Sequence, residues 1–368
     1  MDSIIRAAVE RGASDLHIKP GDVFRARING QLVPLTKQRL TTEQTRQIAL
    51  QLIPNDKDRQ RIDEMQDYDC SWGLPGVGRF RVNILRQRAS LMIVMRVIPI
   101  EIPTFEQLGL PPVLQRIAEH ERGLVLVTGV TGSGKSSTQA AMLGHMNQHM
   151  RRHIVTLENP IEFLHRDLNS SITQREIGVD TESFRHGLRA ALRQDPDVIL
   201  IGEMRDTESI DIALKSAETG HMVVSTVHTR DTTATISRLV AVFPAEEQQM
   251  VRIRLAEQLQ AIVSQRLLPR KDGKGRVLAA EIMVVTGTIR DCILDPEKMS
   301  EIPDLIAEGR TTYGSQTFDQ HLMELVRTDQ VDFQVAKAAA SNPSDFDLKM
   351  NMFSGTGGGG AVGSAYGF

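Results

Sequence analysis

The chain has few cysteines, few aromatic residues and no long apolar run. Cys70 and Cys292 are far apart and lack metal-ligand spacing, so we expect neither a disulfide framework nor a zinc site, and a reducing compartment is favoured. Aromatic residues make up 4% of the sequence and the formal net charge is −3, which argues against nucleic acid as a partner. No stretch approaches about 18 uninterrupted apolar residues, and the N-terminus lacks the apolar core of a signal peptide. We therefore expect a cytoplasmic protein without a transmembrane segment.

A glycine-rich stretch provides the clearest signal for function. The apolar run Leu124–Val127 predicts a buried strand, and a helical pattern begins at Ser137. Between them, residues 129–136 match G-x-x-x-x-G-K-[ST] without a mismatch, which predicts a nucleoside triphosphate site. Lys135 would place its charge on the β- and γ-phosphates, and Ser136 would ligate Mg²⁺. The candidate nucleotide-binding residues are Gly129, Thr131, Gly132, Ser133, Gly134, Lys135, Ser136 and Ser137.

The sequence pattern changes near residue 100. Residues 1–100 alternate in short strands around an Asn29-Gly30 hairpin signal, which predicts a small α/β domain with a mostly antiparallel sheet. Prolines 99 and 103 mark its boundary. From residue 104, strands alternate with helices, which is typical of a parallel sheet covered by helices on both faces, as in RecA-like nucleotide motors.

We expect the second domain to span 101–285. Its predicted strands lie near 124–128, 154–157, 198–201, 222–227 and 277–284. Its predicted helices lie at 136–149, 182–193, 206–219, 231–241 and, as one longer helix, 246–267. Residues 286–350 read as a helical C-terminal segment, and residues 351–368 as a Gly-rich disordered tail.

Three acids follow predicted strands. Glu203 ends an apolar run, where a carboxylate beside a phosphate-binding strand can hold Mg²⁺ through water. Glu158 and Glu162 follow another strand, where a hydrolase needs a base or a water-positioning group. The residues alone do not decide which of these two acts.

Two histidines and a group of arginines are further candidates. His221 and His228 bracket the strand at 222–227, so they could sense the γ-phosphate or be ordinary hydrogen-bonding histidines. Arg81 and Arg96 belong to a basic run in the first domain. They could be arginine fingers that reach a nucleotide from a neighbouring domain or subunit, or part of a solvated basic edge.

Seven stretches occur in the order of one known family. They are ASDLHI, GRFRVN, GVTGSGKS, VTLENPIEF, RQDPDVILIGEMRD, TGHMVVSTVHT and QTFDQHLMELV. The chain thereby resembles the type IV pilus retraction ATPases of the PilT and PilU type, within the GspE-like secretion ATPase superfamily. The resemblance runs from about residue 13 to 349. It implies a PAS-like N-terminal domain, a RecA-like domain and a motor that couples ATP hydrolysis to pilus retraction and twitching motility.

The resemblance also implies roles for the candidate residues. Glu203 matches the Walker B acid, residues 158–162 match the family's Asp box with Glu162 as water activator, and His221 and His228 match its His box. Arg81 and Arg96 match arginines that reach the nucleotide of a neighbouring subunit. Implied cofactors are ATP and Mg²⁺. Implied partners are five further copies in a homohexamer and a PilC-like platform protein, at the inner face of the cytoplasmic membrane.

The sequence also departs from the family pattern. Asn159 stands where the family usually has Asp, and residues 288–295, TIRDCILD, only partly match the AIRNLIRE helix of PilT-type motors. An alternative is therefore a PilU-like accessory motor that depends on a paralogous retraction ATPase. The four-cysteine motif of pilus-extension and type II secretion ATPases is absent, which disfavours those relatives. An ATP-binding scaffold without turnover is disfavoured by the intact lysine and carboxylates.

Overall fold

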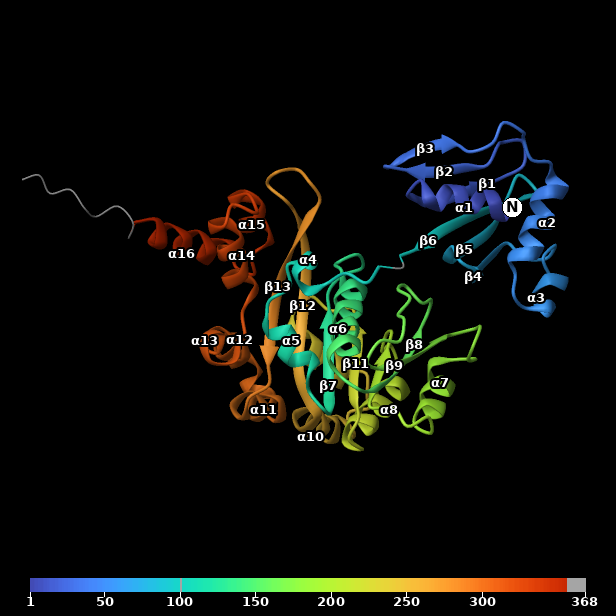
Figure 1. The fold of residues 1–368 in the computed structure, drawn as a ribbon. Coiled ribbons are helices and arrows are strands. Elements are labelled where there is room, and N and C mark those ends of the chain that lie inside the picture. The colour runs from blue at the N-terminus through green and yellow to red at the C-terminus, as the bar shows by residue number, and fades with distance from the viewer. Residues whose placement is uncertain (100, 356–368) are drawn as a thin grey trace, which may run out of the picture. The chain divides into compact units, whose positions relative to one another are not determined.

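The computed structural model describes residues 1–99 and 101–355 (Figure 1). Contacts group the chain into two compact units, residues 1–102 with 147–202, and residues 103–146 with 203 onward. The fold is α/β as predicted, with an antiparallel sheet at the N-terminus and a second, mostly parallel sheet. The predicted domain boundaries stay predictions. Helix α16 continues to Gly355, and residues 356–368 of the predicted Gly-rich tail lie outside the described residues.

The N-terminal sheet has six strands in the order β3-β2-β1-β6-β5-β4. Its elements are α1 (Asp2–Glu10), β1 (Ala13–Ile18), β2 (Arg25–Ile28), β3 (Gln31–Pro34), α2 (Thr42–Leu52), α3 (Asp56–Gln60), β4 (Asp67–Leu74), β5 (Gly78–Gln87) and β6 (Ser90–Ile98). The predicted hairpin is present, since Asn29 and Gly30 have φ of 51° and 79° between β2 and β3. One face of the sheet packs on α1 and α2 around the fully buried Leu16, Phe80 and Met95.

The second sheet has seven strands in the order β13-β12-β7-β11-β10-β8-β9. The strands are β7 (Gly123–Thr128), β8 (His153–Glu158), β9 (Ser171–Glu176), β10 (Val198–Ile201), β11 (Met222–Val227), β12 (Leu259–Pro269) and β13 (Arg276–Val284). β7 pairs in parallel with β11 and β12, and β8 pairs in parallel with β9 and β10. β7 and β11 are buried along their whole length, which explains the apolar runs Leu124–Val127 and Met222–Val224 within them.

Helices follow most of these strands (Figure 1). They are α4 (Phe105–Leu108), α5 (Val113–Ala118), α6 (Lys135–His149), α7 (Phe184–Ala191), α8 (Thr207–Glu218), α9 (Thr232–Ala241), α10 (Gln248–Gln258), α11 (Gly287–Leu294), α12 (Ile302–Glu308), α13 (Arg310–Tyr313), α14 (Phe318–Arg327), α15 (Phe333–Ala339) and α16 (Pro343–Gly355). Within the described residues, no helix is long and apolar enough to cross a membrane.

One predicted element is wrong. The sequence pattern predicts a single helix over 246–267, but α10 ends at Gln258 and β12 begins at Leu259. Strand β12 pairs with β7 and β13 and contacts helices α9 and α15, and most of its residues are buried, so its apolar side chains need not follow one face. The predicted helices and strands on either side of this segment are present.

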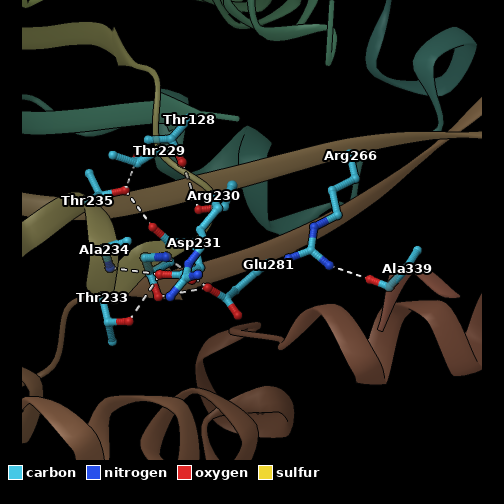
Figure 2. A network of polar contacts seen from close by, with 12 residues as sticks. Thr128, Thr229, Arg230, Asp231, Thr233, Ala234, Thr235, Arg266, Glu281 and Ala339 are labelled. Carbon is cyan, nitrogen blue, oxygen red and sulfur yellow. Dashed lines mark hydrogen bonds and ion pairs between the residues drawn. The ribbon is translucent and has the colours of Figure 1, made fainter. Parts of the chain in front are cut away.

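Polar side chains of strand β12 contact other elements of its unit (Figure 2). Ser264 Oγ lies 2.8 Å from Thr128 Oγ1, at the end of β7. Two residues further along the chain, Arg266 donates a hydrogen bond to the carbonyl oxygen of Ala339, and its guanidinium carbon lies 3.8 Å from the centre of the Phe318 ring. One strand therefore touches both the strand before the glycine-rich loop and the C-terminal helices.

Candidate functional site

The glycine-rich loop joins the end of β7 to the start of α6. Gly129 has φ of 138°, and a Cβ atom there would lie 2.5 Å from both the carbonyl oxygen of Gln265 and the Oγ of Ser133. Gly132 and Gly134 have φ of 78° and 90°, in the region that favours glycine. The loop therefore needs glycine at 129 for space and at 132 and 134 for backbone conformation, which leaves its backbone open to approach by phosphate oxygens.

Lys135 is the first residue of α6, and its ammonium group turns back over the loop. Nζ donates hydrogen bonds to the carbonyl oxygens of Gly129 at 2.9 Å and Val130 at 3.0 Å. The Oγ of Ser133 is buried without a hydrogen-bond partner among the described residues. A lysine held over the loop and an unsatisfied hydroxyl both fit a phosphate ligand.

The remaining loop candidates lie on the rim and the first turn of α6. Thr131 is exposed, whereas Ser136 and Ser137 are half-buried. Helix α6 has 15 residues, so its N-terminal amides and dipole favour a negative charge at this point. Ser136 is therefore placed at the end of the helix where phosphates and their Mg²⁺ would be bound.

Glu203, His228 and Lys135 form a chain of contacts next to the loop. Glu203 Oε1 lies 3.3 Å from His228 Nε2, and His228 Nδ1 lies 3.5 Å from Lys135 Nζ. The other carboxylate oxygen, Oε2, accepts from Arg205 Nη2 at 2.6 Å. Three predicted site residues are thus brought together, and the sequence interpretation assigned no role to Arg205, although it follows Glu203 by two residues.

Glu203 is held in its ionised form. Burial raises the pKa of its carboxyl group, but the hydrogen bond from Arg205 and the charges of His228, Arg205 and Lys135 outweigh that effect, so the pKa lies below the ordinary value. An ionised carboxylate near the loop is a suitable outer ligand for a hydrated Mg²⁺. The described residues contain no group of three or more His, Cys, Asp or Glu side chains that could hold a metal alone, so an ion here would also need phosphate and water oxygens.

Glu158 and Glu162 differ strongly in their surroundings. Glu158 Oε1 accepts from Thr156 Oγ1 at 2.6 Å and from Gln174 Nε2 at 3.1 Å. Burial raises the pKa of Glu158, and the hydrogen bonds from Thr156, Gln174 and the Glu162 amide only partly oppose it. Glu162 is exposed, beyond the cis peptide bond between Asn159 and Pro160.

The two predicted histidines are separated by the whole of β11. His221 precedes the strand, and its Nδ1 lies 2.9 Å from the carbonyl oxygen of Ser216 and 3.1 Å from Thr219 Oγ1. His228 follows the strand and contacts Glu203. A strand of this length spans roughly 20 Å, so His221 does not join His228 at the loop of its own chain.

Arg81 and Arg96 lie on one face of the N-terminal sheet. They are direct cross-strand neighbours on β5 and β6. Arg96 Nε donates to Asp15 Oδ1 at 3.0 Å, although 71% of the Arg96 side chain remains exposed. Arg81 is also exposed. Both arginines are accessible on their own domain, and one already has an acidic partner there.

Comparisons with known proteins agree on one family. The model of the "Type II/IV secretion system protein" family matches residues 1–339. The chain is 43% identical to the type IV pilus retraction ATPase PilT of Pseudomonas aeruginosa, over 93% of this chain and 98% of that protein. It is 39% identical to the type IV pilus ATPase PilU of the same organism, over 95% and 91%. A crystal structure of the pilus retraction motor PilT with bound ADP superposes with a TM-score of 0.85 at 42% identity, covering 95% of this chain and 99% of the other.

Proposed function

Because this chain belongs to the type II/IV secretion system protein family and is an ATPase of its pilus-retraction type, we propose that its loop and neighbouring acids hydrolyse Mg²⁺-ATP to withdraw type IV pili. The predicted resemblance to retraction ATPases is confirmed. The observation that carries the chemical assignment is the contact chain from Lys135 through His228 to Glu203 beside the loop.

In this proposal the loop holds the phosphates. Lys135 exchanges its bonds to the carbonyl oxygens of Gly129 and Val130 for bonds to the β- and γ-phosphates. Ser136 would hold Mg²⁺ directly and Glu203 would hold it through water, because Ser136 lies in the first turn of α6 and Glu203 is joined to Lys135 through His228. When bound there, Mg²⁺ would neutralise charge on the transferring phosphoryl group. His228, bonded to Glu203 on one side and next to Lys135 on the other, is placed to respond to the γ-phosphate.

We assign water activation to Glu162 and loop support to Glu158. A carboxylate that accepts from Thr156, Gln174 and a backbone amide has few lone pairs left for a water molecule. Glu162 is exposed and follows Glu158 in the same loop, so its carboxylate is available to substrate water.

The variants Glu162→Gln and Glu158→Gln test this division. Glu162→Gln should bind ATP as the native protein does and lose turnover, because the amide cannot take a proton from water. Glu158→Gln keeps an oxygen acceptor for Thr156 and should lower kcat less. The measurements are steady-state ATPase rates and titration with a fluorescent ATP analogue. Native turnover by Glu162→Gln would contradict the assignment and make Glu158 the candidate base.

Assembly and location are further parts of the proposal. We propose a homohexamer in which Arg81 and Arg96 of one subunit reach the nucleotide of the next, because both are exposed and basic. The ring would work in the cytoplasm, at the inner face of the membrane, on a PilC-like platform protein.

The accessory role remains the second candidate. The similarity to PilU is nearly as extensive as that to PilT, and the segment 288–295 only partly keeps the PilT-type motif. An accessory motor would restore retraction only in cells that also contain a paralogous retraction ATPase. A primary motor would restore it in cells that lack every other one.

A further inference from the structure

We propose that Gln174, in β9, is a positioning residue for ATP hydrolysis that fixes the loop 159–165 and thereby places Glu162. The inference rests on the proposed role of Glu162 as water activator. β9 was missed in the sequence interpretation because its sequence, SITQRE, is polar and short. No role was assigned to Gln174.

The side chain of Gln174 uses both ends of its amide on this loop. Nε2 donates to Glu158 Oε1 at 3.1 Å and to the carbonyl oxygen of Phe163 at 2.9 Å. Oε1 accepts from the amide of His165 at 2.8 Å. One amide group thus binds the residue before the loop and two residues on its far side, with Glu162 between them.

The strand partners explain why these groups meet. β8 and β9 are parallel, with Thr156 opposite Gln174 and Glu158 opposite Glu176. These four side chains therefore project from one face of the sheet. The fourth, Glu176, accepts from the amide of Ile161 at 3.1 Å. Two residues of β9 therefore hold the loop at three positions. Glu176 binds residue 161, and Gln174 binds residues 163 and 165.

The same contacts favour the ionised form of Glu158, although burial keeps the pKa of its carboxyl group above the ordinary value. Hydrogen bonds from Gln174, Thr156 and the Glu162 amide favour ionised Glu158, whereas burial and the negative charge of Glu162 oppose ionisation. A protonated Glu158 would lose acceptor capacity and release part of the loop. Glu162 is therefore held correctly only while Glu158 is ionised, and Gln174 favours that state.

The experiment compares three variants of the full chain with a control. Gln174→Leu removes all three contacts at similar volume, and Gln174→Glu places a second carboxylate against Glu158. The double variant Glu158→Gln/Gln174→Glu exchanges amide and carboxylate and restores a donor–acceptor pair. The control is Thr173→Ala, which lies on the same strand but faces the other side, where it contacts His153.

We expect Gln174→Leu and Gln174→Glu to lower kcat by about tenfold or more, the range for a lost hydrogen bond to a buried charge, with the KM for ATP nearly unchanged. In Gln174→Leu the loss of a donor raises the pKa of Glu158, so the acid limb of the kcat–pH profile should move to higher pH. The double variant Glu158→Gln/Gln174→Glu should have a kcat at least about fivefold higher than that of Gln174→Glu alone.

Three results would overturn the inference. The first is a kcat and a pH profile of Gln174→Leu that match those of Thr173→Ala. The second is an exchanged pair no more active than Gln174→Glu although both proteins melt like the native one. The third is native turnover by Glu162→Gln, run in parallel, which refutes the proposed water activator as well. If Glu162→Gln is inactive and only the Gln174 variants are normal, the assignment of Glu162 stands and the role of Gln174 is refuted.

Discussion

Replacing Gly129 with alanine should destabilise the protein and weaken nucleotide binding, because the new methyl group has no space. Its Cβ would lie 2.5 Å from the carbonyl oxygen of Gln265, a backbone atom of strand β12, and 2.5 Å from Ser133 Oγ. The serine side chain can rotate away, but the strand cannot move without disturbing β7 and β13. The loop must therefore shift, and with it the carbonyl group to which Lys135 donates.

The expected loss of stability has two parts. A non-glycine residue at φ of 138° costs about 1–3 kcal/mol, and crowding a packed site costs about 1–3 kcal/mol more. Gly132→Ala is the matched control, since Gly132 has a positive φ but no atom within 4 Å of the added Cβ. It should lose only the conformational part, about 1–2 kcal/mol.

Equilibrium unfolding in urea measures the first effect, and titration with a fluorescent ATP analogue measures the second. Gly129→Ala should unfold at lower urea than Gly132→Ala and bind the analogue at least about tenfold more weakly, because its loop is displaced. Equal stability and equal affinity of the two variants would refute the steric argument.

Two further predictions concern residues outside the loop. Burial raises the pKa of Glu281, whose Oε1 accepts hydrogen bonds from Thr232 N at 3.0 Å and Thr232 Oγ1 at 2.8 Å. The protonated Glu281 side chain therefore contributes stability that is fully present below the pKa of the unfolded state. This stability is lost as the pH rises through the pKa of the folded state. Glu281→Gln should therefore gain stability relative to the native protein as pH rises above about 4, the ordinary pKa of a glutamate, and a melting-temperature difference that stays constant with pH would contradict this. Arg290 and Asp291 are exposed on α11, so changing both to alanine should alter stability by about 0.5 kcal/mol each at most and leave the ATPase rate within about twofold. If α11 contacts the pilus machinery, retraction should stop, and retraction that persists with this variant as the only motor would exclude that role.

Local patterns predicted most of the fold. The apolar runs of β7 and β11 are as buried as expected, and the Asn29-Gly30 pair forms the predicted hairpin. The helix predicted over 246–267 is wrong because a helical spacing of apolar residues continues across two different elements, α10 and β12. These residues are Val251, Leu255, Leu259 and Ile262. In a strand covered on both faces the apolar residues need not alternate with polar ones, so periodicity no longer separates strand from helix.

The parts of the candidate site that belong to a short sequence motif could be predicted from the sequence. The glycine-rich loop, Lys135 and the acid at 203 could all be identified from local sequence. The partners that orient the acids could not, since Gln174 is 16 residues from Glu158 and meets it only through the pairing of β8 with β9. The pairing of Arg96 with Asp15 likewise depends on strand neighbours 81 residues apart.

The contacts of β12 have a consequence for exchanging parts between related motors (Figure 2). Arg266 binds the C-terminal helices through Ala339 and Phe318, while the preceding residue, Gln265, places its carbonyl oxygen against Gly129. A chimera that takes its C-terminal helices from a paralogue, but keeps this strand, would join an arginine to surfaces that did not evolve with it. A poor fit between Arg266 and the new helices would shift the neighbouring carbonyl group of Gln265, and this shift would displace the glycine-rich loop at Gly129. Functional grafts should therefore begin before residue 259 rather than at the start of the helical segment.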